Sequence, residues 1–192
     1  MVRHSIALIG LVVGLISSSA RATSVVPFTF DSLCETAEKI AHVTCISSES
    51  FEANDGIRTR IRFQVMEGVK GAAADEIELA LPGGQVGDRR VSIAGMPSFK
   101  PGEETVIFLS GPDRAGSPWP VGLGQGCYPV TKDSASKPTV RLRRGATPIP
   151  VGAALKPVGM GVYEVELGAF LDKVRETVGV EADALEGEES AK

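Results

Sequence analysis

GIRTRIRFQV, residues 56–65, alternates between apolar or β-branched side chains and charged or polar ones over its whole length. The positions on one side are Ile57, Thr59, Ile61, Phe63 and Val65, and those on the other are Arg58, Arg60, Arg62 and Gln64. A period of two residues is typical of a β-strand with one buried and one solvated face. A helix would place the same arginines around its whole circumference. The segment therefore predicts a long strand, continuing to residue 69, whose apolar face is covered by the rest of the chain.

Segments on both sides of this strand predict further strands and two helices. The expected strands lie at residues 39–48, 75–81, 89–94, 104–109, 119–131 and 139–143. Apolar residues occupy both sides of the strand at residues 39–48, which indicates that both its faces are covered. In the strand at residues 89–94, Val91 and Ile93 are expected to point inward. A short helix is expected at residues 31–38, capped by Asp31 or Ser32. A second helix is expected at residues 167–178, ending at Gly179. Residues 145–161, rich in proline and glycine, predict an irregular segment.

The series of short strands predicts a mainly β fold. We expect a small closed or partly open OB-like barrel of five to six strands, with a short N-terminal helix and a C-terminal helix. Gly122, Gly124 and Gly126 loosen the strand at residues 119–131 and indicate bends at a barrel corner. A β-sandwich is the competing architecture. The strand at residues 57–69 favours the barrel, because so long a strand usually bends and joins two sheets.

Residues 1–22 have the pattern of a secretory signal peptide. Arg3 and His4 give a positive start, residues 6–16 are apolar, and Ala20-Arg21-Ala22 is the small-x-small pattern of a cleavage site. The apolar run is shorter than the roughly 20 residues of a membrane span. We expect cleavage after Ala22, no membrane span thereafter, and export to the periplasm or the extracellular medium. Residues 23–178 then form a single domain, and residues 179–192 an acidic disordered tail.

The three cysteines of the chain are Cys34, Cys45 and Cys127. The oxidising environment of an exported protein permits a disulfide, and an odd number of cysteines leaves one thiol unpaired. We predict a bridge between Cys34 and Cys127, because it would hold the N-terminal helix against the barrel, and a free buried thiol at Cys45. A bridge between Cys45 and Cys127 is the second choice.

The order of several short motifs resembles a known family. The matching residues are Leu33-Cys34-x-x-Ala37, Phe63-x-Val65, Val69-Lys70-Gly71, Leu81-Pro82-Gly83-Gly84, Pro101-Gly102-Glu103, Phe108-Leu109 and Gly124-Gln125-Gly126. Together they resemble small secreted bacterial proteins with an OB-type barrel similar to netrin-like modules, which include the tissue inhibitors of metalloproteinases. The resemblance implies this fold and binding to a protein. It does not imply the inhibitors' chemistry, which uses an N-terminal cysteine, because we expect the mature chain here to begin at Thr23, and its first cysteine is Cys34.

Residues suited to catalysis or metal binding are sparse. His42 is the only histidine after the signal peptide, and no nucleophile elbow accompanies it. No pair of Cys or His residues has the short spacing of a structural zinc site. We therefore predict no catalytic residue, no metal ligand and no cofactor. An enzyme of unrecognised type is kept as one alternative.

Arginines give the remaining candidate site. Arg58, Arg60 and Arg62 form a row on the outer face of the central strand, and Arg141, Arg143 and Arg144 lie together on a later hairpin. Arg89 and Arg90 add a third patch. One interpretation is a solvated face neutralised by Glu76 and Glu78 on the next strand. The other is a surface that binds an anion or an acidic partner.

The function predicted from the sequence is that of an exported, non-enzymatic binding module. Its partner would be a protein, such as an exported protease or an envelope component. A polyanion or glycan bound by the arginine row is the alternative ligand. The formal net charge of −4 argues against nucleic acid, whose binding needs clustered lysine and arginine.

Overall fold

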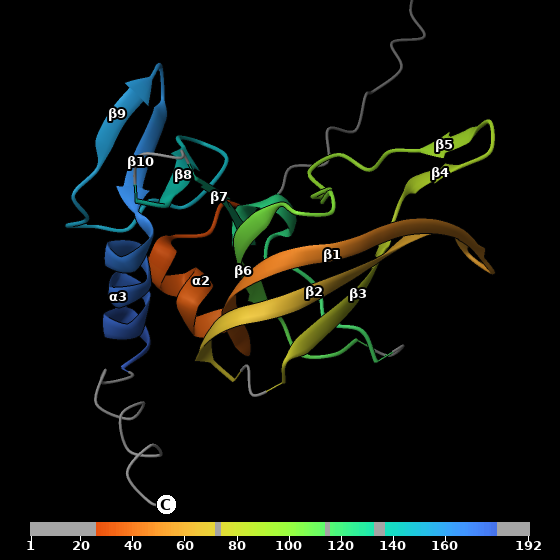
Figure 1. Cartoon of the computed structure of the whole chain (residues 1–192), viewed down its shortest axis with the longest axis horizontal. Coiled ribbons are helices and arrows are strands. Elements are labelled where there is room, and N and C mark those ends of the chain that lie inside the picture. The colour runs from red at the N-terminus through yellow and green to blue at the C-terminus, as the bar shows by residue number, and fades with distance from the viewer. Residues whose placement is uncertain (1–25, 72–73, 114–115, 133–136, 180–192) are drawn as a thin grey trace, which may run out of the picture.

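The computed structural model describes residues 26–71, 74–113, 116–132 and 137–179. The fold is mainly β, with one large antiparallel sheet, a separate pair of strands and two helices (Figure 1). The strand order in the large sheet is β3-β2-β1-β6-β7-β8-β10-β9. This sheet has two ends, β3 and β9, and among the described residues it does not close into a barrel. None of the helices in these segments is long and apolar enough to cross a membrane.

A long hairpin of β1 (Lys39–Ala53) and β2 (Gly56–Lys70) forms the centre of the fold. The predicted alternation in β2 is confirmed, because Ile57, Ile61 and Phe63 are buried while Arg60 and Arg62 are exposed. β1 extends beyond the predicted end at residue 48. An irregularity in the β1–β2 register between residues 45 and 47 adds one residue to β1. Such a bulge changes which residues of the later half of the strand face inward.

The next strands complete a Greek key around this hairpin. β3 (Glu76–Pro82) pairs with β2, and β6 (Glu104–Leu109) returns to pair with the other side of β1. The spatial order β6-β1-β2-β3 is that of a Greek key. β7 (Cys127–Thr131) follows β6, and β8 (Thr139–Arg143) follows β7.

Three segments differ from the sequence prediction. The expected strand at residues 119–131 is a strand only in β7, because the chain before it turns through the 3₁₀-helix η2 (Leu123–Gly126). A Cβ atom at Gly126 would lie 2.6 Å from the Val121 carbonyl oxygen, so this tight path requires glycine. The segment at residues 145–161 is not wholly irregular, since β9 (Lys156–Gly159) pairs with β10 (Val162–Glu166).

The third difference concerns residues 84–94. β4 (Gly84–Val86) and β5 (Arg89–Val91) form a two-stranded sheet of their own. Val91 and Ile93, expected inward, are 41% and 38% exposed. This small sheet and the free end of the β1–β2 hairpin extend to the same side of the molecule (Figure 1).

Both predicted helices are present. α2 (Phe30–Thr36) begins one residue earlier than expected, because Thr29 rather than Asp31 or Ser32 is the N-cap and forms a capping box with Ser32. α3 (Leu167–Val178) ends at Gly179, whose φ of 70° suits the left-handed C-cap, as predicted.

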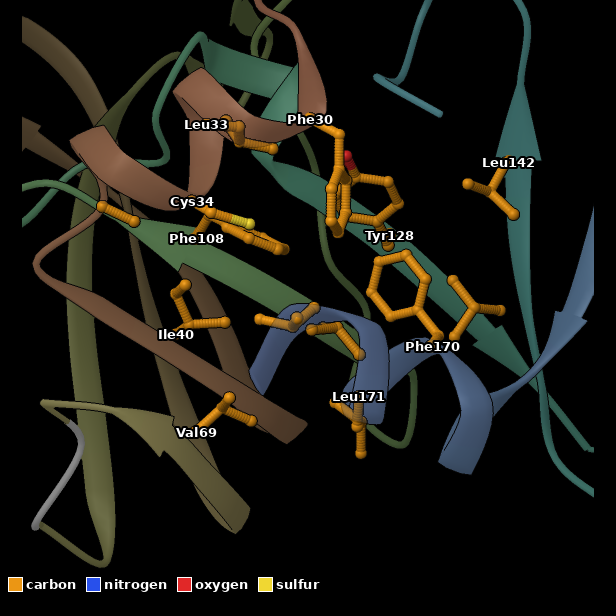
Figure 2. Packing of buried hydrophobic residues seen from close by; sticks show 14 of the residues in the cluster. Phe30, Leu33, Cys34, Ile40, Val69, Phe108, Tyr128, Leu142, Phe170 and Leu171 are labelled. Carbon is orange, nitrogen blue, oxygen red and sulfur yellow. The ribbon is translucent and has the colours of Figure 1, made fainter. Parts of the chain in front are cut away.

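Two hydrophobic clusters pack on opposite faces of β1 and β6. Ile40 and Phe108 belong to the cluster beneath the helices, which we call the helix-side core and which also contains Phe30, Tyr128 and Phe170 (Figure 2). Residues of the same strands that point the other way form the second cluster, the hairpin-side core: Ala41, Val43, Cys45, Ile107 and Leu109, with Ile61 and Phe63 of β2. The prediction that both faces of the first strand are covered is thus confirmed.

Candidate functional site

The arginine row on β2 is already provided with partners. Arg58 binds Asp55, with 2.6 Å between Nη2 and Oδ2, and the Arg60 guanidinium lies 3.3 Å from Glu78 and 4.9 Å from the centre of the Phe51 ring. The Nε–H group of Arg62 donates to Ser47 at 3.1 Å. The hollow on this face, about 250 Å³, is lined by Arg60, Arg62, two glutamates and a serine. The row therefore resembles the neutralised, solvated face more than a free cationic surface.

Arg141 and Arg143 lie on β8, in the other half of the sheet. Three strands, β1, β6 and β7, separate β8 from β2 in the sheet order. Arg141 pairs with Glu164 on β10 at 3.0 Å, and Arg143 is exposed. The two groups of arginines therefore do not form one surface.

His42 belongs to a small polar cluster at the edge of the helix-side core. Its side chain is 8% exposed, and its Nε2 lies 3.0 Å from Glu104 Oε2, while the second oxygen of Glu104 accepts from Lys132 at 2.6 Å. Burial lowers the pKa of His42, although the hydrogen bond to Glu104 acts in the opposite direction. Burial alone would raise the pKa of Glu104, but hydrogen bonds from Lys132 and His42 outweigh it and hold that pKa below its ordinary value.

These shifts predict a loss of stability on mild acidification. Because the folded chain disfavours protonated His42, the unfolded chain binds the extra proton more readily, and stability falls as the pH drops through 6.5, the ordinary pKa of histidine. The stability that the lowered pKa of Glu104 contributes is lost only at lower pH, below the ordinary pKa of 4.5. Urea titrations of the wild type between about pH 7 and pH 5 should show this decline, and His42→Gln should flatten it. An unchanged pH dependence in His42→Gln would contradict the assignment.

One cavity lies between the distal part of the β1–β2 hairpin and residues 83–99. We call it the hairpin cavity; its volume is about 330 Å³. Buried Ile61, Leu81 and Phe99 contribute apolar wall, and exposed Val91 and Ile93 stand at its border. Its polar wall consists of Ser48, Ser50, Thr59, Arg90, Ser92 and Ser98.

Gly84 makes the close approach on one side of this cavity possible. Its φ is +128°, and a Cβ atom there would lie 2.3 Å from Ser50 Oγ and 2.4 Å from Thr59 Oγ1. The two hydroxyls are 3.1 Å apart, Thr59 donates to the Gly83 carbonyl oxygen, and Ser50 accepts from the Gln85 amide. The Pro82-Gly83-Gly84 bend thus fixes β4 to the hairpin and shapes the cavity wall.

A larger cavity of about 680 Å³ lies against β6 and β7. We call it the β7 cavity. Its walls include Thr105, Cys127 and Pro129, with Glu104 and Lys132 contributing charge. Pro97, Ser98 and Phe99 line both cavities. Residues 97–99 therefore connect the two hollows of the hairpin side.

The predicted Cys34–Cys127 disulfide is absent from the structure. Cys34, Cys45 and Cys127 are all buried and unbonded. Cys34 packs in the helix-side core and Cys127 in the hairpin-side core, so the two thiols serve opposite faces of the sheet. The expectation that Cys45 is a free buried thiol is met. Burial raises the pKa of Cys34 to about 12 and that of Cys127 further still, which disfavours the reactive thiolate at both.

Metal ligands do not gather anywhere in the part of the chain that the structure describes. No group of three or more His, Cys, Asp or Glu side chains there is arranged to hold a metal ion. The signal cleavage site at Ala22 and the acidic tail beyond residue 179 lie outside the described residues.

Comparison of the chain with protein-family models, with curated proteins and with solved structures gave no match. The cavities are the feature that sequence reasoning missed. Their walls are assembled from the hairpin and from residues 82–99, where Val91 and Ile93 were interpreted as core residues of a strand. One available signal was the pair Arg90 and Ser92, which alternates with them and gives that side of the segment a polar character.

Proposed function

We propose that the protein is an exported, non-enzymatic module that binds a protein partner at the mouth of the hairpin cavity. The observation that carries the proposal is the pair Val91 and Ile93, which are exposed by 41% and 38% beside an open cavity with apolar walls. Exposed apolar side chains next to a hollow are typical of interaction sites. Export is supported by the signal-peptide pattern that ends at Ala22. The partner would be another exported protein, such as a protease or an envelope component.

The non-enzymatic part of this proposal is supported by the burial of the histidine and the three cysteines. His42 is buried and bound to Glu104, whose other oxygen is held by Lys132. All three thiols are buried, and the pKa of each is raised. Groups held in this way serve packing and local structure, whereas nucleophiles and general bases need access to a substrate.

We further propose that β1, β2, β3, β6 and β7 are the core of an OB-type barrel related to netrin-like modules. The Greek-key order of the first four strands supports the proposal, since five-stranded OB barrels are partly open Greek-key barrels. In the order β3-β2-β1-β6-β7 the strands that would have to meet are β3 and β7. A crystal structure in which these two strands close on each other would establish the relationship.

Site-specific photo-crosslinking tests the binding function. A photoreactive amino acid is placed at Val91 or Ile93, and the protein is exported by its own organism and illuminated there. We expect a covalent adduct with a protein at both positions. The matched control is Met160, which is fully exposed in the turn between β9 and β10; Figure 1 shows this hairpin well apart from β4 and β5. No adduct at either position, or the same adducts from Met160, would reject the proposed site.

The arginine row offers weaker support for a polyanion or glycan ligand. Arg58 and Arg60 are each paired with a carboxylate and Arg62 with a serine hydroxyl. The carboxylates beside Arg58 and Arg60 reduce the positive potential that an external anion would meet, so this face is second to the hairpin cavity.

A further inference from the structure

Two neighbouring arginines of β5 differ in their contacts. Arg89 reaches β1, where its Nη1 lies 2.5 Å from Glu52. Arg90 instead lines the hairpin cavity. Within the described residues its guanidinium has neither an ion pair nor a hydrogen bond.

The other polar groups of the cavity wall also favour an anion. None of the residues that line it is acidic, whereas the β7 cavity has Glu103 and Glu104 and the hollow on the arginine row has two glutamates. The hydroxyls of Ser48, Ser92 and Ser98 have no hydrogen-bond partner among the described residues. The cavity therefore combines one unneutralised cation with unused hydrogen-bond donors.

The rest of the wall is apolar. Ile61, Leu81 and Phe99 are buried in it, and Met96 adds to this surface. A ligand that satisfies the whole cavity must carry both a negative charge and an apolar group. At about 330 Å³ the cavity is near the lower end of the range for ligand sites, roughly 300–1,000 Å³. It suits the end of a chain better than a long segment.

We propose that the hairpin cavity binds the free C-terminal end of a partner polypeptide whose last residue is apolar. Arg90 would pair with the terminal carboxylate, the free serine hydroxyls would donate to its oxygens, and the last side chain would lie against Leu81 and Phe99. A terminal residue carries its carboxylate and its side chain on one Cα atom, so a single residue offers both groups. An internal Asp or Glu would bring main chain on both sides and no adjoining apolar group. The inference rests on the proposed function, because it names the part of the protein partner that is recognised.

Fluorescence anisotropy with short labelled peptides tests this specificity. The peptides share a Gly-Ser stem and end in Leu, Val, Phe or Ser, each as the free acid and as the amide. We expect at least one apolar-ended acid to bind and its amide to bind about tenfold more weakly, as expected for one charge-assisted contact. Arg90→Gln should weaken binding of the acid by a similar factor and leave the amide unchanged. Arg89→Gln is the matched control, because it removes the same charge one residue away, and should bind the acid as the wild type does.

Several outcomes would overturn the inference. They are equal binding of acid and amide, equal losses in Arg89→Gln and Arg90→Gln, a Ser-ended acid that binds as well as the best apolar one, or no binding by any peptide. Decanoate provides a further arm: if it binds in an Arg90-dependent way and no peptide does, the site takes a small amphipathic acid and the polypeptide proposal is wrong. Crosslinks from Val91 and Ile93 to a protein in these cases would leave the proposed function standing. Thermal melting of both variants verifies that they are folded.

Discussion

Phe63→Ala is expected to lower the free energy of unfolding by roughly 3–5 kcal/mol, the range for truncating a large buried aromatic side chain. Phe63 lies on the inner face of β2 with no exposed surface. Its ring meets that of Phe99 edge-on, with 5.0 Å between centroids and an angle of 87° between planes. Phe99 lines both cavities. The truncation should therefore loosen residues 97–99 as well as destabilise the hairpin-side core.

Arg60→Ala is the matched control, because it changes the opposite face of the same strand. Arg60 is half-exposed and pairs with Glu78 at 3.3 Å, and such pairs contribute about 0–1 kcal/mol. Urea denaturation followed by tryptophan fluorescence measures both variants. Comparable losses for the two would mean that the faces of β2 are assigned the wrong way round.

The local sequence pattern was sufficient to predict β2 and α3. β2 alternates strictly, and its burial follows that alternation. α3 has an apolar stripe and a glycine stop, and both ends of the helix were predicted correctly. In such elements the side chains that set the secondary structure also form the core, so pattern and packing agree.

Predictions failed where the chain path depends on distant contacts. The β9–β10 hairpin comes from a proline- and glycine-rich segment, and only its pairing with β8 makes it part of the sheet. The segment at residues 90–93 alternates like a buried strand, yet its strand β5 pairs only with β4 and leaves Val91 exposed. No local rule separates a strand that joins the main sheet from one that forms a separate pair.

The candidate site illustrates the same limit at the level of single residues. The sequence pattern drew attention to the arginines of β2, because three of them stand in a row, and marked Arg89 and Arg90 only as a further pair. In the structure Arg58 and Arg60 meet carboxylates, whereas Arg90 lines the hairpin cavity without one among the described residues. Arg89 and Arg90 are indistinguishable by residue type, and only the position of Glu52 on β1 decides which of them is paired. Long-range pairing of charges is thus the information that the sequence pattern lacks.

Phe170→Ala should destabilise the helix-side core by a similar amount, roughly 3–5 kcal/mol. Phe170 has no exposed surface, and its ring lies 5.8 Å from that of Phe30 in α2 and 4.9 Å from that of Tyr128 in β7 (Figure 2). Its ring therefore joins α3 to both α2 and the sheet. Glu176→Ala is the control on the same helix, since Glu176 is 70% exposed and only pairs with Lys173, and it should cost less than about 1 kcal/mol.

The three buried thiols report which core is loosened. Cys34 lies in the helix-side core with Phe170, while Cys45 and Cys127 lie in the hairpin-side core across the sheet. Local opening exposes a buried thiol in proportion to the stability of the part that covers it. In Phe170→Ala, alkylation of Cys34 under native conditions should therefore accelerate more than that of the other two, and in Phe63→Ala the order should be reversed. Equal acceleration of all three thiols in both variants would mean that the two clusters open only together, as one cooperative unit, despite the sheet that lies between them.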